Sequence, residues 1–445
     1  MCTSPIHLVR SGISGFNYDV PCSNCLECRS TLQDAWVFRL TQDLKYLYAH
    51  DGRAVFLTFT YNNEHLPFSN FGLKGINQEC FDNYNVKSFL NKVKVYMWRK
   101  YGKSSYKYFV CEEYGKYTRR PHLHGIFMLG PTVDYLDFCA MCRKLWSYGF
   151  MFPRYKCGRY VDSKGKFTSP LLRSWQKAGA YAAKYITKDL DFYGLDAVKT
   201  YLECRHLYTR AEVKHYNNCL PKHYQSKGLG CSFLSQINTP QKLLDAINNK
   251  VQSAYNLKYV ELPRYYVQKL CYYTSKCHNF AGDIFYRSFV RPEYVPCVCA
   301  VYEKSLQSKI KQLEKFRLSY HLLSSRLDAD AQRLCGRVFS RYSSEEIVCA
   351  GFVHSLSFGN QFLFTRNFKK FSVQNVINFR KDFMLNVFHD VKLDCSPYAD
   401  GYFDDIVKYM DIAFGVVNKL RAEDNLKRYR EFLINRKLKF LSYAS

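Results

Sequence analysis

The sequence predicts an α+β protein with a central antiparallel sheet, followed by a mostly helical C-terminal region. Up to about residue 190, short β-branched and aromatic runs alternate with amphipathic helical patterns. This alternation favours helices packed against an antiparallel sheet. From about residue 280 onward, the sequence holds long helical patterns rich in Lys and Arg. A hydrophobic content of 47% and an aromatic content of 17% can build a core, so disorder is not the main state.

The first elements alternate between helix and strand. Residues 1–29 are loop-like, and residues 30–50 predict a helix because their apolar positions recur at helical spacing. These positions are Trp36, Phe38, Leu40, Leu44 and Leu47. The β-branched and aromatic run Arg53–Tyr61 predicts a strand. Residues 85–102 predict a basic amphipathic helix that ends near Gly102.

Two further strands are predicted to form a hairpin. The runs Tyr106–Gly115 and Pro121–Leu129 have strand character and are separated by a short turn that contains Arg. Residues 132–149 then predict a helix that ends at Gly149, and short or edge strands follow at 150–157 and 165–170. Residues 171–190 predict a helix again, with Gly179 as a break or a start within it.

The C-terminal region predicts helices over 305–340 and 403–441. The predicted division is a Cys-rich arm at 1–29, a sheet-containing domain with a downstream extension at 30–275, and a basic helical region at 276–445. The sequence itself does not define a role for this last region.

The charge of the chain points to a polyanionic partner. Lys and Arg total 65 against 38 Asp and Glu, which leaves a formal net charge of +27. Nucleic acid is the simplest such partner, and the 38 Tyr and 34 Phe include rings on which bases can stack. A basic but inert surface is the alternative. No secretory signal and no stretch of about 18 apolar residues is present, so no membrane association is expected. Nineteen scattered cysteines favour a reducing cytoplasm over a disulfide framework.

His122-Leu123-His124 is the first candidate for chemistry. Residues two apart on a strand share a face, so both imidazoles would point the same way while Leu123 packs into the core. Two imidazoles on a rigid face can bind a divalent ion when a carboxylate joins them. Glu112 and Glu113 lie on the preceding strand, and their side chains alternate, so only one can share the histidine face. The alternative is a polar strand edge.

A pair of tyrosines is the second candidate. Tyr181 and Tyr185 lie four residues apart on one face of the predicted helix, and Lys184 and Lys188 each follow a tyrosine by three. A phenol becomes a useful nucleophile toward a phosphodiester when a metal polarises the phosphate and a cation offsets the charge. Packing of both rings in the core is the alternative.

The N-terminal cysteines are the third candidate. Cys22, Cys25 and Cys28 are each separated by two residues, and Cys2 can supply a fourth ligand, which suits a closed tetrahedral zinc site. Reduced free thiols and a metal held by three ligands are the alternatives. Another Cys-x-x-Cys pair, at positions 139 and 142, lies on a predicted helix with no partner pair, so both are expected in the core.

Together these motifs resemble the HUH-type rolling-circle replication initiators. The strand at Phe56–Thr60, the Glu113 and His-x-His strands and the tyrosine helix occur in the order of that family. With the N-terminal cysteines added, residues 1–275 resemble most closely the initiators of gokushovirus-like microviruses, which are small bacteriophages with circular single-stranded DNA.

The resemblance implies a fold, an activity and partners. The fold is a ferredoxin- or RRM-like HUH endonuclease domain in which Phe56–Thr60 forms the strand beneath the site. The metal ligands are His122, His124 and Glu113, which hold Mg²⁺ or Mn²⁺. Tyr181 and Tyr185 are nucleophiles supported by Lys184 and Lys188. The implied partners are single-stranded and origin DNA with host helicase and polymerase, in the host bacterial cytoplasm.

The activity implied is nicking through a 5′-phosphotyrosine and a 3′-OH primer, with later strand rejoining. Basic residues near the motifs, Arg119, Arg120 and Lys177, are candidates for DNA binding, and a solvated turn is an equal alternative for the two arginines. A zinc-stabilised basic protein that binds or packages DNA without cutting it is the competing function.

Overall fold

The computed structural model describes residues 6–9, 17–20, 26–115, 120–162, 164–176, 178, 195–253, 259–278, 282, 284–357, 372–385 and 402–441. They form two compact units. The sheet unit comprises Arg29–Gln236 with Val251–Pro263. The helical unit comprises Met1–Cys28, Ile237–Lys250 and Arg264–Ser445.

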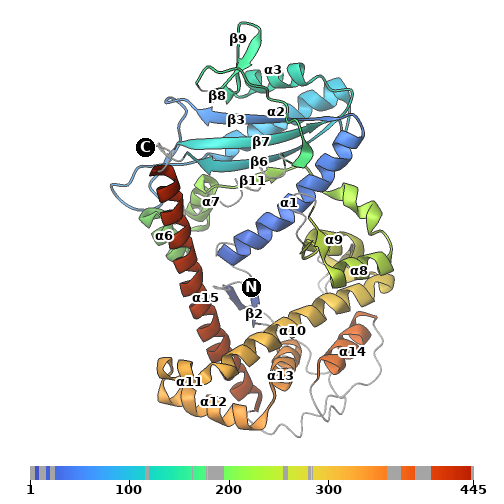
Figure 1. Ribbon diagram of the computed structural model, residues 1–445, viewed down its shortest axis with the longest axis vertical. Coiled ribbons are helices and arrows are strands. Elements are labelled where there is room, and N and C mark those ends of the chain that lie inside the picture. The colour runs from blue at the N-terminus through green and yellow to red at the C-terminus, as the bar shows by residue number, and fades with distance from the viewer. Residues whose placement is uncertain are drawn as a thin grey trace. The chain divides into compact units, whose positions relative to one another are not determined.

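A five-stranded antiparallel sheet forms the centre of the sheet unit. Its order is β11 (His223–Gln225), β6 (Tyr106–Tyr114), β7 (Pro121–Leu129), β3 (Arg53–Tyr61) and β8 (Gly149–Phe152). Figure 1 shows β3, β7 and β6 side by side, with α1 on one side of them. The predicted α+β class and the β6–β7 hairpin are confirmed.

The two faces of the sheet pack against different helices. Alternate residues such as Phe59, Leu123 and Phe127 are buried with the apolar sides of α2 (Asn83–Tyr101) and α3 (Tyr135–Leu145). The opposite face packs against α1 (Leu26–Ala49) at its Phe109, Ile126 and Met128 end. α1 contributes Trp36, Leu40 and Leu44 to that contact. The remainder of this face is the part of the sheet on which the two histidines lie.

Local sequence signals set the helix ends. Asp82 and Asp134 are the N-caps of α2 and α3, and their carboxylates accept backbone N–H groups of the first turn. Gly102 ends α2 with a φ of 83°, a conformation that glycine adopts without steric cost. The predicted end of α3 at Gly149 was wrong, because the helix ends at Leu145 and Gly149 pairs with Tyr61 in the sheet.

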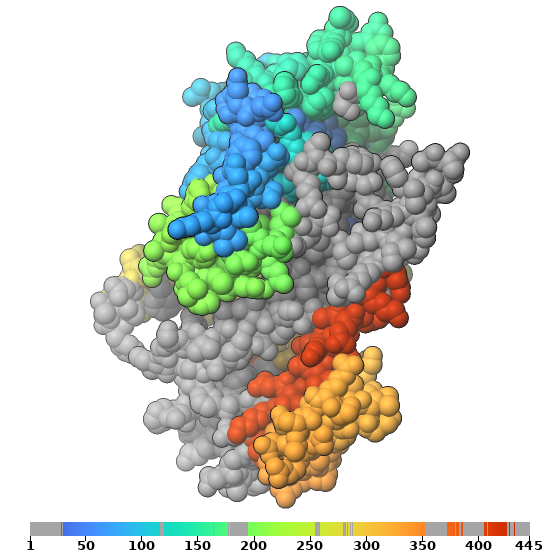
Figure 2. Space-filling model, turned by 90° about the vertical axis from the view of Figure 1, so that its left-hand side faces the viewer, coloured from blue at the N-terminus to red at the C-terminus, as the bar shows by residue number. Residues whose placement is uncertain are grey.

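A layer of small elements packs beside α2. The paired strands β4 (Phe68–Ser69) and β5 (Gln78–Glu79) precede α2, while α6 (Asp196–Glu203) and α7 (Arg210–Cys219) precede β11. Phe71 and Cys80 from the first segment are buried with Val198, Tyr201 and Cys219 from the second. Figure 2 shows this contact from outside, as blue atoms against green ones. The hairpin of β9 (Arg154–Lys156) and β10 (Arg159–Val161) follows β8.

The helical unit confirms the predicted helical C-terminal region. Its core holds Leu313 and Phe316 of α10 (Val295–Leu318), Tyr409 of α15 (Tyr402–Leu441), and residues of the helices between them. The pattern over 305–340 is divided, because α12 begins anew at Ala329 with Asp328 as its N-cap. The unit's other elements are β1 (Ile6–Val9), β2 (Asn17–Val20), α8 (Pro240–Asn249), α9 (Arg264–Cys271), β14 (Tyr272–His278), β15 (Ile284–Val290), α11 (Tyr320–Leu323), α13 (Ser344–Ser357) and α14 (Val373–Met384). The pair β12 (Val251–Gln252) and β13 (Tyr259–Val260) belongs to the sheet unit.

Membrane-spanning length and apolarity together are found in none of the helices that the structure describes.

Candidate active site

The strand register places His122 and His124 on the same face of the sheet. His122 lies between Glu113 of β6 and Thr60 of β3, and His124 lies between Cys111 and Thr58. Leu123 points to the opposite face, where it is 1% exposed within the α2–α3 core. Both histidines are partly exposed. The predicted alternation along this strand is therefore what the structure shows.

Glu113, rather than Glu112, lies on the histidine face. The Oε2 atom of Glu113 lies 3.0 Å from Nε2 of His124, and their side chains are 5% and 12% exposed. Glu112 is fully buried on the other face, where Oε2 accepts the N–H of Lys222 at 2.6 Å and Oε1 accepts the hydroxyl of Tyr224 at 3.3 Å. Glu112 is thus a structural acid that holds β11 against β6.

Two residues of β3 hold the His124 ring. The hydroxyl Oγ1 of Thr58 lies 3.0 Å from Nδ1 of His124, and the ring of Phe56 stacks on the imidazole at 5.7 Å with an interplanar angle of 13°. A partner on one ring nitrogen sets the tautomer and so the role of the other nitrogen. Motif reading missed the contact of Thr58. The signal was present, since Phe56 and Thr58 share one face of the predicted strand by their spacing of two.

The three donors fit a divalent ion by chemistry, and two of them by position. Two ligand atoms at a right angle on an ion with bonds of about 2.1 Å lie about 3.0 Å apart, which is the Glu113–His124 separation. The mixture of imidazole and carboxylate suits Mn²⁺ better than Mg²⁺, which favours oxygen ligands. The His122 and His124 ring centroids are 6.3 Å apart. As the side chains stand, no three acidic, His or Cys side chains in the described ranges close around one point.

Gly115 leaves space for His122 at the end of β6. A Cβ at this position would lie 2.9 Å from Nε2 of His122. The N–H of Gly115 donates to the carbonyl of Arg120 at 2.9 Å, which closes the strand pair on the other side of the loop. The "EEYG" sequence therefore places a carboxylate and a small residue on either side of the same imidazole.

The histidines border a cleft of about 960 Å³. Its wall is formed by Phe56, Thr58, Thr60, Tyr61, Asn62, Asn63, Glu64, Arg120, His122, His124, Phe150, Phe152, Pro153, Asp162, Thr168, Ser169 and Leu172. Phe150 is 48% exposed, so its face is available for stacking. Nη2 of Arg120 donates to Oδ1 of Asn63 at 2.7 Å, which positions the guanidinium at the cleft wall. A cleft with aromatic rings and a guanidinium suits a nucleotide chain.

Tyr61 is the tyrosine that lines the cleft among the residues the structure describes. It is 1% exposed, its hydroxyl is directed toward the carbonyl of Asp82 at 3.5 Å, and burial raises its pKa far above the ordinary value. The phenolate is therefore strongly disfavoured at this position. Tyr61 is a core residue and is unsuited to act as a nucleophile.

Several predicted site residues lie outside the described residues. They are Cys2, Cys22, Cys25, Arg119, Lys177, Tyr181, Lys184, Tyr185 and Lys188. Cys28, the remaining cysteine of the predicted zinc site, is partly buried on α1. The segment before the predicted tyrosines runs along β3, since Leu172 donates its N–H to Ala54 and Phe56 donates to Pro170. The tyrosine motif thus follows a segment anchored at the cleft.

The predicted core cysteines of α3 are confirmed. Cys139 and Cys142 are both fully buried. Burial raises the pKa of the Cys139 thiol to about 12 and holds the pKa of Cys142 well above its usual range. Neither thiol is suited to metal binding as a thiolate.

Residues 54–190 match a family model for replication-associated proteins of the ORF2 type. The matched range contains β3, Glu113, both histidines and the predicted tyrosine motif. No curated protein and no solved structure was found to match the chain. This part of the chain is therefore similar to a family of rolling-circle replication initiators.

Proposed function

We propose that the chain is a rolling-circle replication initiator that nicks single-stranded origin DNA with a tyrosine and later rejoins the strand. The observation that carries this proposal is the contact of Glu113 with His124 beside His122, at a cleft inside the range that matches the family. A carboxylate and two imidazoles on one rigid face form a ligand set for a divalent cation.

In this proposal His122, His124 and Glu113 hold Mn²⁺ or Mg²⁺. Such an ion, when bound, polarises a non-bridging phosphate oxygen and offsets charge that develops in the transition state. Thr58 and Phe56 keep the His124 ring in place, which leaves Nε2 directed to Glu113. Phe150 offers a face for a base, and Arg120 offers a guanidinium for a phosphate.

The nucleophile in this proposal is Tyr181 or Tyr185. Its phenolic oxygen attacks phosphorus and loses its proton to solvent or a basic group. The bond from phosphorus to the 3′ oxygen breaks, and that oxygen takes up a proton. The products are a 5′-phosphotyrosine and a 3′-OH, with no change in the number of phosphoester bonds. Lys184 and Lys188 offset negative charge, and attack by a later 3′-OH on the phosphotyrosine closes a circle without ATP.

The remaining partners follow from this chemistry. The 3′-OH is a primer for the host polymerase, and a host helicase must open the duplex ahead of it in the bacterial cytoplasm. A zinc site at Cys2, Cys22, Cys25 and Cys28 stays a prediction that metal analysis of the purified chain can test. Four thiolates would bind one zinc ion per chain.

A nicking assay tests the proposed function. The full chain is incubated with single-stranded origin DNA in Mn²⁺ or in EDTA, and covalent adducts are resolved under denaturing conditions. We expect cleavage with Mn²⁺, none with EDTA, and no adduct from a Tyr181→Phe/Tyr185→Phe variant. Binding without cleavage under every condition would favour the non-catalytic DNA-binding function, for which the net charge of +27 is the supporting observation.

A further inference from the structure

Helix α2 carries a strongly basic outer face. It contains Lys87, Lys92, Lys94, Arg99 and Lys100 and no acidic residue between Asn83 and Tyr101. Its inner face, which includes Val86, Phe89, Leu90, Val93 and Met97, is buried against the sheet. The face that it covers carries Leu123, opposite to the face with the histidines. The basic side of α2 is therefore exposed on the far side of the sheet from the cleft.

Two aromatic rings lie among these cations. Tyr84 and Trp98 are each 54% exposed, and Val95 between them is 43% exposed. The helix from Tyr84 to Trp98 spans about 21 Å, and spacings built from steps of three and four residues keep all three side chains on one side. The ammonium groups of Lys87 and Lys103 lie 5.9 Å and 5.1 Å from the Tyr84 and Trp98 ring centroids.

A shallow groove of about 960 Å³ runs along this side of α2. Its lining residues are Tyr84, Lys87, Ser88, Asn91, Lys92, Val95, Tyr96, Arg99, Lys100 and Leu145, and none of them is acidic. Together with Trp98, we call this set the α2 surface. Four cations and the aromatic and aliphatic groups between them form one continuous stripe.

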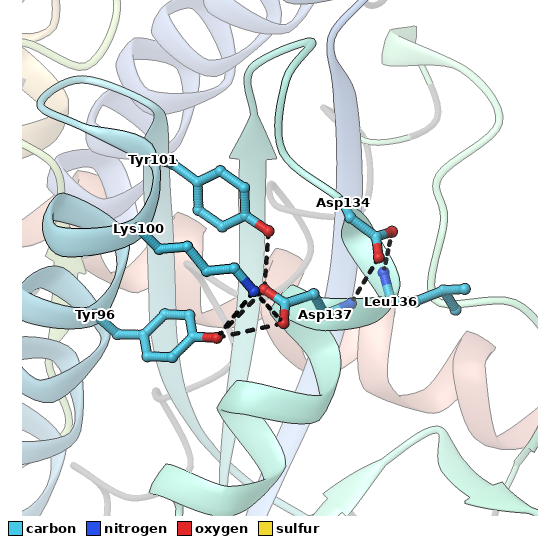
Figure 3. Close-up of polar contacts among 6 residues, drawn as sticks. All are labelled: Tyr96, Lys100, Tyr101, Asp134, Leu136 and Asp137. Carbon is cyan, nitrogen blue, oxygen red and sulfur yellow. Dashed lines mark hydrogen bonds and ion pairs between the residues drawn. The ribbon is translucent and has the colours of Figure 1, made fainter.

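Asp137 of α3 fixes the wall of the groove. Its carboxylate accepts hydrogen bonds from Lys100 at 2.7 Å, Tyr101 at 2.8 Å and Tyr96 at 3.3 Å, as Figure 3 shows. Burial of Asp137 opposes its ionisation, but the hydrogen bonds from Lys100 and Tyr101 outweigh it and lower its pKa. Lys100 is thereby neutralised, so Lys87, Lys92 and Arg99 supply the excess positive charge of the groove.

We propose that the α2 surface binds single-stranded DNA, without sequence preference, as a second site on the opposite side of the sheet from the cleft. The cations would contact phosphates, and the rings of Tyr84 and Trp98 would stack on bases. Single strands offer unpaired bases to such rings, whereas a duplex presents only its backbone and grooves, so the exposed aromatic groups select the single strand. Holding a displaced strand away from the nicking cleft is a use that rests on the proposed function, while the binding itself does not.

Salt-dependent binding to a labelled oligothymidylate tests this proposal. The full chain is used in EDTA, so that cleavage takes no part and the result is independent of the proposed nicking. A Lys87→Ala/Lys92→Ala/Arg99→Ala variant should lower the slope of log K against log [salt] by about 2, because each phosphate that is no longer neutralised reduces it by about 0.7. Trp98→Ala should weaken binding about 5- to 100-fold with little change in this slope, because the ring carries no charge.

The matched control removes the same charge elsewhere on the sheet unit. Lys199→Ala/Arg210→Ala/Lys214→Ala changes three exposed cations on α6 and α7 and should leave the slope and the affinity nearly unchanged. Trp98 fluorescence, taken as the difference between wild type and Trp98→Phe, should be quenched by the oligonucleotide. Equal effects of the two triple variants would overturn the proposal. An equal weakening of duplex and single-stranded DNA binding, or an unquenched Trp98, would overturn the assignment to single strands.

Discussion

Oγ1 of Thr58 lies 3.0 Å from Nδ1 of His124, while Nε2 of the same ring lies 3.0 Å from the Glu113 carboxylate. The hydroxyl can donate to Nδ1 or accept from it, so Thr58 supports either tautomer of the ring. When Nδ1 carries the proton and donates to Thr58, the lone pair of Nε2 is available to a cation. The threonine on β3 thus acts as a positioning residue for the histidine on β7.

Replacing Thr58 tests this role directly. Thr58→Val keeps the shape and the strand preference of the side chain but removes the hydroxyl. We expect nicking to fall about 10- to 100-fold, and the Mn²⁺ concentration for half-maximal activity to rise, as happens when such partners of metal ligands are removed. Thr58→Ser restores the hydroxyl and should recover most of the activity. Full activity of the valine variant at low Mn²⁺ would contradict this role.

The two adjacent glutamates should respond in opposite ways to the same substitution. Glu113→Gln weakens a cation site and should abolish nicking while the melting temperature of the sheet unit changes little. Glu112→Gln turns an amide N–H toward the N–H of Lys222 and should lower the free energy of unfolding by about 1–3 kcal/mol. Circular dichroism melts and nicking assays on both variants provide the comparison, each variant serving as the control for the other.

Gly336→Ala should stabilise the helical unit. Gly336 lies within α12 (Ala329–Arg341), it is exposed, and a Cβ added there meets nothing within 4 Å. Glycine costs about 0.5–1 kcal/mol relative to alanine in a helix, so the free energy of unfolding should rise by about that amount. Denaturant melts measure the change. Nicking should remain at the wild-type rate, and a decrease in stability would mean that the helix is packed differently at this position.

His223 should make the sheet unit less stable in mild acid. It lies against Trp36 and Phe109, and burial, with the positive charge of Arg39, lowers its pKa below the ordinary value of 6.5. The unfolded chain therefore binds a proton at this residue more readily than the folded chain does. Stability rises with pH between the lowered pKa and 6.5, and it declines as the pH falls below 6.5.

Melting temperatures between about pH 5 and pH 8 check this dependence. His223→Gln should flatten the pH profile of stability in that window, because the titrating group is gone. His50→Gln, at an exposed position on the unit surface, is the control and should leave the wild-type profile in place. An unchanged profile in the His223 variant would show that other groups carry the dependence.

Much of the fold followed from local patterns. The limits of β3 match the predicted strand Arg53–Tyr61, and the hairpin of β6 and β7 forms where the two runs were predicted. α2 ends at Tyr101 beside Gly102, as glycine at that position indicated. The predicted end of α3 failed because Gly149 is recruited by its strand partner Tyr61, a contact between residues far apart in the chain. Local periodicity carries no information about such a partner.

The same division runs through the candidate site. Sequence alone determined that His122 and His124 share a face with Leu123 opposed, because side chains of a strand alternate with a period of two. It also determined that only one of Glu112 and Glu113 can join them. Tertiary structure decided that Glu113 is the one and that Thr58 meets His124. The physical reason is that both contacts depend on the register between separate strands, which the whole sheet and the helices packed on it set together.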